Sequence, residues 1–356
     1  MNNTYLKYLF FVTKPYSFSI LEPIQELLTK SNNGEVKWFT ASSAVNISPP
    51  GDHLKSNVDV NEYNPDVVLV PGNVVPHFWS GLKVQIFHGL DEEVKGFYNI
   101  TGFFDLYCTT GPVMTEKFSK IAKLKKHFLV EETGWPKIDP VYNEKWTFND
   151  QKNQLINQHN LNPELPVLLY APTFPTKYTS APDLLGSINN LNNGTYNWII
   201  KFHPLMDKSI QEQYKKIENE NLRVVDELNI LPIMAGSDLM ITDTSSVAYE
   251  FLSFDRPLIT YKAIARKEKG INIQNITDLP ATIERSLNNP DEFSSNRATC
   301  LQEIHPYTDG SSSDRMVQAI EHILNDGLHN EIKQKPINII RKYQIRKMIE
   351  RSEAKG

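Results

Sequence analysis

Three hydroxyl side chains stand in a row directly after a short apolar run, and together they could bind an anion. The run covers residues 239–242, and it is followed by Asp243, Thr244, Ser245 and Ser246 and then by a helical pattern. Hydroxyls and backbone N–H groups at the start of a helix attract negative charge, which the helix dipole also favours. Ordinary N-capping accounts for one hydroxyl but not for three. The segment 238–261 therefore predicts a phosphate-binding turn at residues 244–246.

A lysine and a histidine end another apolar run in the same half of the chain. Lys201 and His203 lie in the segment Ile-Ile-Lys-Phe-His-Pro, and strand alternation predicts that both face the same side. Both side chains can bind phosphate oxygens, and His203 can also supply a proton. A lone histidine here would be structural, but the hydroxyl-rich turn favours a functional role. Thr173, after the run at residues 167–170, forms either a simple turn or a contact with the same ligand.

The first half of the chain carries one candidate base. Residues 84–87 are followed by His88 and Gly89, and the glycine allows the backbone to bend or another group to approach. His88 could accept the proton of a hydroxyl; the alternative is a hydrogen-bonded turn histidine. Asp91, Glu92 and Glu93 come next, but a run of three charges is typical of a solvated face. We therefore predict no metal site.

Several classes of protein are disfavoured by what the sequence lacks. It contains no phosphate-binding loop of the G-x-x-x-x-G-K-[ST] type, no dinucleotide G-x-G-x-x-G motif, no nucleophile elbow and no H-E-x-x-H. The net charge of −5 suggests no nucleic-acid partner. Cys108 and Cys300 form no metal or disulfide pattern, and Cys108 is expected to be buried, which fits a reducing cytoplasm.

Short apolar runs alternate with helical patterns along the chain, which is typical of βαβ units with parallel sheets. The 356 residues predict an α/β protein with two Rossmann-like domains facing a cleft, at residues 1–148 and 149–327. Ligands of such sheets bind beyond the carboxyl ends of the strands. Strands are expected at residues 8–12, 36–39, 67–70, 84–87, 106–108 and 128–130, and then at 167–170, 198–202, 223–225, 239–242 and 258–260.

The tail at residues 328–356 differs from the rest, because lysines and arginines alternate there with isoleucines. It predicts a basic amphipathic helix that could lie on an anionic membrane surface; the alternative is a solvated helix that packs on its own domain. No run is long enough to cross a membrane, and the N-terminus lacks the pattern of a signal peptide. We expect a cytoplasmic protein, soluble or peripheral at the inner face of the membrane.

Six segments follow one another in the order known from a single family. They are Phe87–Leu90 with Lys95 and Gly96, Leu169–Thr173, Lys201–Pro204, Ile241–Val247, Arg256–Tyr261 and Asp309–Arg315. From about residue 84 to 324 the chain resembles the CDP-glycerol glycerophosphotransferases of wall teichoic acid and capsule synthesis. The resemblance implies a GT-B fold. It also implies transfer of glycerol phosphate, or a related polyol phosphate, from a CDP-linked donor to a hydroxyl of a polyprenyl-linked or polysaccharide acceptor.

The same resemblance implies roles for individual residues. His88 and His203 match the family's essential histidines, with His88 as the base, and residues 244–246 match its contact with the donor pyrophosphate. His203 and the hydroxyls would hold the charge that develops on the CMP leaving group. Lys201 and Arg315 would supply cations, and Asp243 and Thr173 would border the donor. CDP-glycerol enters as a substrate, and no metal or other cofactor is required.

Two departures from the family pattern leave other functions open. Leu90 and the three acids after it replace a Thr-Pro-Leu-Lys-like stretch, so a basic contact near the acceptor is missing, and Thr244 stands where Tyr is common. One alternative is a sugar transferase or a nucleotide-sugar 2-epimerase on the same fold, for which Glu250 could hold sugar or ribose hydroxyls. Another is a non-catalytic nucleotide-binding regulator or scaffold.

Overall fold

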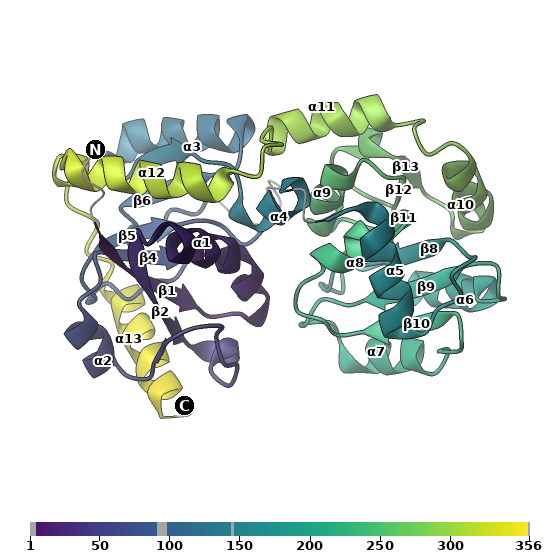
Figure 1. The fold of residues 1–356 in the computed structure, drawn as a ribbon, viewed down its shortest axis with the longest axis horizontal. Helices are drawn as coiled ribbons and strands as arrows, with labels where there is room; N and C mark the ends of the chain where they lie inside the picture. Colours follow the sequence, from purple (N-terminus) through teal and green to yellow (C-terminus); the bar gives the residue numbers. More distant parts are fainter. Residues whose placement is uncertain (1–4, 91–97, 144–145, 355–356) are drawn as a thin grey trace. The chain divides into compact units, whose positions relative to one another are not determined.

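The computed structural model describes residues 5–90, 98–143 and 146–354. The chain forms two α/β units, each built on one parallel sheet with helices packed around it (Figure 1). The first unit comprises Met1–Tyr142 and Glu303–Gly356, and the second comprises Asn143–Gln302. The predicted fold class, two parallel-sheet domains in tandem, is confirmed.

The first unit contains a seven-stranded sheet in the order β3-β2-β1-β4-β5-β6-β7. Because the chain builds outward from β1 to one side and then from β4 to the other, the strand order reverses between β1 and β4. Ligands of open parallel sheets bind at such a reversal. The strands are β1 (Leu6–Val12), β2 (Gly34–Thr40), β3 (His53–Leu54), β4 (Val67–Val70), β5 (Leu82–Gln85), β6 (Leu106–Thr109) and β7 (Leu129–Glu132). The helices are α1 (Phe18–Ser31), α2 (Asn57–Tyr63), α3 (Pro112–Lys125), α4 (Asp139–Tyr142), α12 (Ser312–Asn325) and α13 (Ile339–Glu353).

The second unit contains a six-stranded sheet in the order β10-β9-β8-β11-β12-β13, which reverses between β8 and β11. Its strands are β8 (Val167–Tyr170), β9 (Asn197–Lys201), β10 (Leu222–Val225), β11 (Leu239–Thr242), β12 (Leu258–Tyr261) and β13 (Ile271–Ile273). Its helices are α5 (Phe148–His159), α6 (Ala181–Leu191), α7 (Lys208–Lys215), α8 (Leu231–Ala235), α9 (Val247–Phe251) and α10 (Leu279–Asn288), with α11 (Ser294–Ile304) at its end.

The predicted strands are present because each apolar run is buried by helices, as a parallel sheet requires. β4, β8 and β11 have the predicted bounds, and all of their residues are buried. β5 is different: it ends at Gln85 rather than at residue 87, because Phe87 adopts a left-handed backbone conformation with φ of 58°. The short strands β3 and β13 were not predicted.

The chain returns to the first unit at Glu303, so that residues 303–327 do not belong with the second unit as the sequence suggested. Helix α12 packs against α1 (Figure 1). Its start is held by the buried carboxylate of Asp139, which accepts the backbone N–H of Ser312 at 2.9 Å and the N–H and hydroxyl of Ser313 at 2.8 and 2.7 Å. These contacts join segments far apart in the sequence, which no local pattern could indicate.

Within the basic tail at residues 328–356, helix α13 starts only at Ile339. Ile345 and Ile349 are buried in the core of the first unit, next to residues such as Phe78 and Trp79. The helix therefore packs on the first unit, which was the alternative considered for the tail. Four apolar residues at its start remain largely exposed, namely Ile337, Ile339, Ile340 and Tyr343. Among the described residues, no helix is long and apolar enough to span a bilayer.

The packing of α13 predicts that its two faces differ in their effect on stability. Ile349 is 0% exposed and Ile340 is 75% exposed. Because truncation of a buried isoleucine leaves a cavity, Ile349→Ala should lower the free energy of unfolding by about 2–5 kcal/mol. Ile340→Ala is the matched control and should change it by less than about 0.5 kcal/mol. Calorimetry of both variants checks this; equal melting temperatures would show that α13 does not pack on the first unit in solution.

Candidate functional site

The loops that follow three adjacent strands of the second unit meet at the carboxyl edge of its sheet. β8 lies between β9 and β11, so the loops after these strands are neighbours. The Ala171 N–H donates to the Ile241 carbonyl at 3.0 Å, and the Thr242 hydroxyl donates to the Ala171 carbonyl at 2.6 Å. This is the point where the strand order reverses, which is the expected ligand position in such a sheet.

Asp243 ties these loops together. One carboxylate oxygen accepts the Thr173 N–H at 2.8 Å, and the other accepts both the N–H and the hydroxyl of Ser180 at 2.8 Å. Asp243 is 2% exposed, so these charge-assisted hydrogen bonds replace the water that the carboxylate loses on burial. The carboxylate thus positions Thr173 and the start of α6, and a direct contact between Asp243 or Thr173 and a donor stays a prediction.

The three predicted hydroxyls follow Asp243 immediately. Thr244 and Ser245 are each 7% exposed, and Ser246 stands at the N-cap of α9 without a side-chain capping bond. Within the described part of the chain, none of the three hydroxyls has a hydrogen-bond partner. Capping therefore does not account for them, and contact of these hydroxyls with an anion stays a prediction.

His203 lies on the neighbouring loop. Its ring stacks on Phe174 with centroids 4.4 Å apart and an angle of 24° between the planes. Its Nδ1 accepts the Leu205 N–H at 3.1 Å, so in the neutral ring Nε2 carries the proton and acts as a donor. β9 ends at Lys201, so strand alternation does not extend to His203, and it is the loop that orients the ring.

Lys201 and Glu250 are both buried, at 8% and 3% exposure. The Lys201 ammonium donates to the Phe202 carbonyl at 2.8 Å. Its charge also contributes to a lowered pKa of Glu227, whose largest cause is the hydrogen bond from His159. Glu250 lies on α9, one turn beyond the hydroxyls. The structure thus brings Thr173, Lys201, His203, residues 243–246 and Glu250 into one unit.

In the first unit, His88 is exposed and the residue before it is firmly held. The Phe87 ring is buried in the core, and its carbonyl accepts the indole N–H of Trp135 at 3.2 Å. A left-handed conformation is unfavourable for a bulky residue, at a cost of about 1–3 kcal/mol, so these contacts must impose it. The turn presents His88 beside Tyr16, with ring centroids 6.0 Å apart. Burial raises the pKa of Tyr16, which keeps its hydroxyl protonated.

A cavity of 260 Å³ adjoins His88 at the carboxyl edge of the first sheet. Thr13 and Lys14 line it from the loop after β1, and Gly72 and Asn73 line it from the loop after β4. It therefore occupies the strand reversal of the first unit, as the loops of Asp243 and Thr173 occupy that of the second.

Arg315 lies in the first unit, although the sequence placed it with the donor residues. Its guanidinium bonds to the Thr133 carbonyl at 3.0 Å and to Asp309 at 2.7 Å, and it lies 3.9 Å from the Tyr307 ring centroid. These contacts fix the loop before α12. A donor contact of Arg315 stays a prediction.

No sequence pattern pointed to three residues that shape the site: Ser180, Phe174 and Trp135. Ser180 could have been noticed, because it precedes an Ala-Pro helix start, but its partner Asp243 is distant in sequence. Asp91, Glu92, Glu93, Lys95 and Gly96 lie outside the described residues. Within the described ranges, no group of three or more His, Cys, Asp or Glu is arranged to hold a metal ion. Cys108 is buried, as expected, and burial raises the pKa of its thiol.

Comparison with known proteins adds a family to this geometry. The family model described as CDP-glycerol:poly(glycerophosphate) glycerophosphotransferase matches residues 7–322. The chain belongs to this family. The resemblance inferred from the six motifs is thus confirmed, and the match extends to the N-terminal strands that the motifs did not cover.

One relative is similar to this chain in sequence, and two solved structures are similar to it in fold. The chain is 22% identical over 246 residues to the teichoic acid glycerol-phosphate primase of Bacillus subtilis. This match covers 65% of the chain and 61% of the primase, so the chain spans less than two thirds of that relative. The wall teichoic acid polymerase TagF has a similar fold, with a TM-score of 0.69 and 16% identity over 92% of this chain and 91% of TagF. UDP-GlcNAc 2-epimerase from Neisseria meningitidis matches with a TM-score of 0.64 and 15% identity over 89% and 100% of the two chains. These structural likenesses show the fold.

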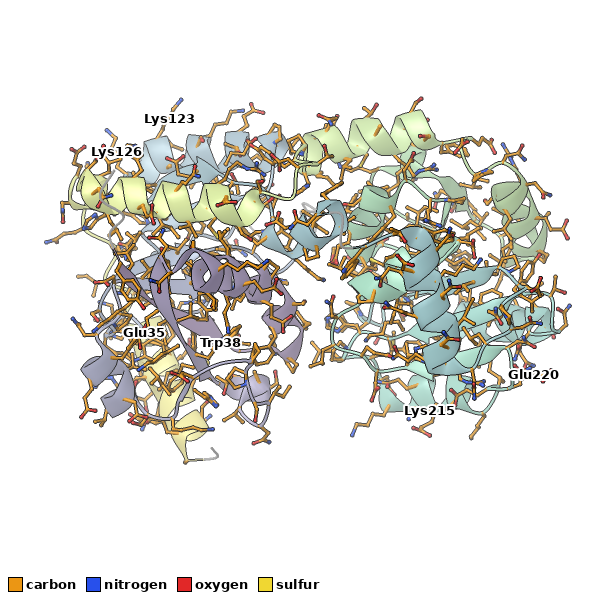
Figure 2. The ribbon with its side chains drawn as sticks, in the orientation of Figure 1. Glu35, Trp38, Lys123, Lys126, Lys215 and Glu220 are labelled. Carbon is orange, nitrogen blue, oxygen red and sulfur yellow. The ribbon has the colours of Figure 1, made fainter. Side chains whose placement is uncertain are left out.

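The role of Asp243 leads to a prediction. Asp243→Asn puts an NH₂ donor where an oxygen now accepts the N–H of Ser180 or Thr173, so at least one buried donor loses its partner. We expect the second unit to lose about 2–4 kcal/mol of stability. Glu220→Gln makes the same chemical change on an exposed side chain (Figure 2) and should be neutral. Urea unfolding of the two variants compares them, and the same midpoint in both would contradict the role assigned to Asp243.

Proposed function

We propose that this protein transfers glycerol phosphate from CDP-glycerol to a hydroxyl of a lipid-linked or polysaccharide acceptor in cell-surface polymer synthesis. The family match over residues 7–322 carries the proposal. The geometry supports it, because hydroxyls, an imidazole and an ammonium gather at the strand reversal of the second unit, where a pyrophosphate would find several donors.

In the proposed reaction, the acceptor oxygen forms a bond to the phosphorus that carries glycerol. The bond from that phosphorus to the oxygen shared with CMP breaks, and CMP leaves. His88 takes the proton of the acceptor hydroxyl as general base. The His203 Nε2–H, Lys201 and the hydroxyls of residues 244–246 bind the pyrophosphate and stabilise the charge that remains on CMP. Thr173, Glu250 and Arg315 are further candidate donor contacts.

The proposal includes no metal ion or further cofactor. The chain's own donors would bind the pyrophosphate, and CDP-glycerol serves as a substrate. Turnover in the presence of a strong chelator of divalent cations tests this part separately from the transfer itself.

A sugar transferase or a nucleotide-sugar 2-epimerase is the second candidate, and the fold shared with UDP-GlcNAc 2-epimerase favours it. The donor distinguishes the two functions. A ligand present at 100 times its Kd stabilises the folded protein by about 2.7 kcal/mol, so melting shifts with CDP-, UDP-, GDP- and CMP-linked donors identify the nucleotide. A shift with UDP-GlcNAc alone would favour the second candidate.

The two histidines provide the direct test of the mechanism. His88→Ala and His203→Ala should each lower kcat for CMP release from CDP-glycerol by about 100- to 10,000-fold, because each removes a proton-transfer or charge-stabilising group. His322→Ala changes an exposed histidine on α12 and is the control. Wild-type turnover in both site variants would refute the proposed roles.

We further propose that the start of α13 attaches the protein to the cytoplasmic face of an anionic membrane. Exposed Ile337, Ile339, Ile340 and Tyr343 lie beside Lys342, Arg346 and Lys347. Apolar side chains next to cations suit the boundary between lipid headgroups and acyl chains. The buried face of α13 stays in the core, so that attachment would not require the helix to leave the unit.

Binding to vesicles tests the attachment. Lys342→Gln and Lys347→Gln should each weaken binding to phosphatidylglycerol-containing vesicles about 5-fold, since one cation near such a surface contributes about 1 kcal/mol. Lys123 and Lys126 lie on and just after α3 (Figure 2), and the same substitutions there serve as controls. Equal losses in both pairs would indicate only a general charge effect and contradict the specific surface.

A further inference from the structure

One side chain holds the peptide group that leads into His88. The Trp135 indole N–H donates to the Phe87 carbonyl at 3.2 Å, and this carbonyl belongs to the peptide group between Phe87 and His88. Phe87 has a φ of 58°, a left-handed conformation that a bulky residue keeps only when its surroundings impose it. Trp135 is 0% exposed, so its hydrogen bond is shielded from water. The indole therefore fixes the direction in which the chain leaves the core at His88.

Trp135 lies in the loop at residues 133–138, and the backbone just before it is tied to strand β6. The N–H groups of Thr133 and Gly134 both donate to the carbonyl of Thr109, the last residue of β6, at 3.0 and 3.3 Å. The first sheet thus holds the start of this loop through its backbone.

The chain at residues 307–315, where α12 begins, packs against the same loop. The Arg315 Nε–H donates to the Thr133 carbonyl at 3.0 Å. Gly134 has a φ of 80°, and a Cβ atom at this position would lie only 2.9 Å from the Tyr307 ring. Glycine is therefore required for the close approach of the two segments. The loop that carries Trp135 is thus held by the sheet and also by the chain that returns to the first unit.

All three nitrogens of the Arg315 guanidinium donate to the protein itself. Besides the Thr133 carbonyl, they bond to the Asp309 carboxylate at 2.7 Å and to the Ser312 hydroxyl oxygen at 3.3 Å. The guanidinium also lies 3.9 Å from the centroid of the Tyr307 ring. A planar, forked group suits this set of partners, which the single ammonium of a lysine cannot satisfy at once. These contacts place Arg315 to hold the loop at Thr133.

We propose that Arg315 and Trp135 are positioning residues for His88 and act in series. Arg315 holds the Thr133 carbonyl, and Trp135, two residues further on, holds the peptide group before His88. The inference rests on the proposed function, in which His88 is the general base. A base has to lie within about 2.6–3.2 Å of the hydroxyl whose proton it takes, and a misplacement of about 1 Å can lower a rate about 100-fold. A donor contact of Arg315 would instead change the binding of CDP-glycerol.

Kinetics of CMP release from CDP-glycerol by the full-length protein separate the two roles of Arg315. Arg315→Lys keeps the positive charge that a donor contact would use, but it loses the forked set of bonds. It should lower kcat about 10- to 100-fold and leave KM for CDP-glycerol within about 2-fold of the wild type. Trp135→Phe keeps a buried ring, loses only the indole N–H and part of the ring volume, and should have the same effect. A raised KM with an unchanged kcat in Arg315→Lys, or wild-type kinetics in Trp135→Phe, would overturn the assignment.

Two matched variants control for the loss of ring volume and for the arginine change itself. Trp198 is a buried tryptophan of β9, and its indole N–H has no hydrogen-bond partner among the described residues. Trp198→Phe therefore removes the same ring volume as Trp135→Phe but no hydrogen bond. Arg285→Lys changes an exposed arginine of α10 that pairs with Glu292. Both controls should keep kcat, and an equal loss of kcat in Trp198→Phe and Trp135→Phe would refute the role of the indole N–H.

A double-mutant experiment asks whether the two residues act through His88. In a His88→Ala background, Arg315→Lys and Trp135→Phe should lower the residual rate no further, because all three changes affect the same group. If each change still lowered the residual rate by its full factor, the two residues would act independently of His88 and the proposal would fail.

The environment of the His88 ring provides a readout that does not depend on turnover. In protein labelled with ¹³C-histidine, the NMR signal of the His88 ring is the one that His88→Ala removes. Trp135→Phe and Arg315→Lys should each shift this signal and leave those of His203 and His322 in place. This result would support the positioning role even if CDP-glycerol were not turned over. A His88 signal that stays in place in both variants would overturn the role even if His88 proved to be the base.

Discussion

The buried carboxylate of Asp243 is the interaction on which the second unit's site depends. It stands at the end of β11, and it accepts hydrogen bonds from Thr173 after β8 and from Ser180 at the start of α6. A buried carboxylate is costly unless its oxygens are satisfied, so these partners are held closely. The hydroxyls of residues 244–246 begin at the next position along the chain. The buried carboxylate of Asp243 therefore fixes where these hydroxyls lie at the strand reversal.

The first unit also contains a buried carboxylate with several hydrogen bonds, and this one holds the chain where it returns from the second unit. Asp139 is buried and accepts three hydrogen bonds from Ser312 and Ser313, and this joins the returning chain to the first sheet. Burial raises the pKa of Asp139, because removal from water outweighs the hydrogen bonds that favour its charged form. His88 is positioned in another way, by the left-handed Phe87 and its bond from Trp135. In both units buried neighbours thus hold the backbone from which the candidate functional groups project.

Much of the fold could be predicted because parallel strands are buried on both faces and read as short apolar runs. The runs at residues 67–70, 167–170 and 239–242 became β4, β8 and β11 without change. The prediction was weaker where tertiary contacts override the local pattern. β5 stops at Gln85 because Phe87 turns into the core. Helix α13 starts only at Ile339, so it is shorter than the basic tail at residues 328–356.

The sequence by itself determined the fold class, the family and the candidate residues, because the motifs are local and their order is unchanged by folding. It indicated that His203, Thr173 and residues 243–246 end strands, and parallel topology then requires that they share one edge. Only the tertiary structure decided that Arg315 belongs to the first unit, that Asp243 is used to hold loops, and that Lys14 and His88 line one cavity. Each of these depends on contacts between residues distant in sequence, such as Asp139 with Ser312 or Thr173 with Asp243, which local patterns do not encode.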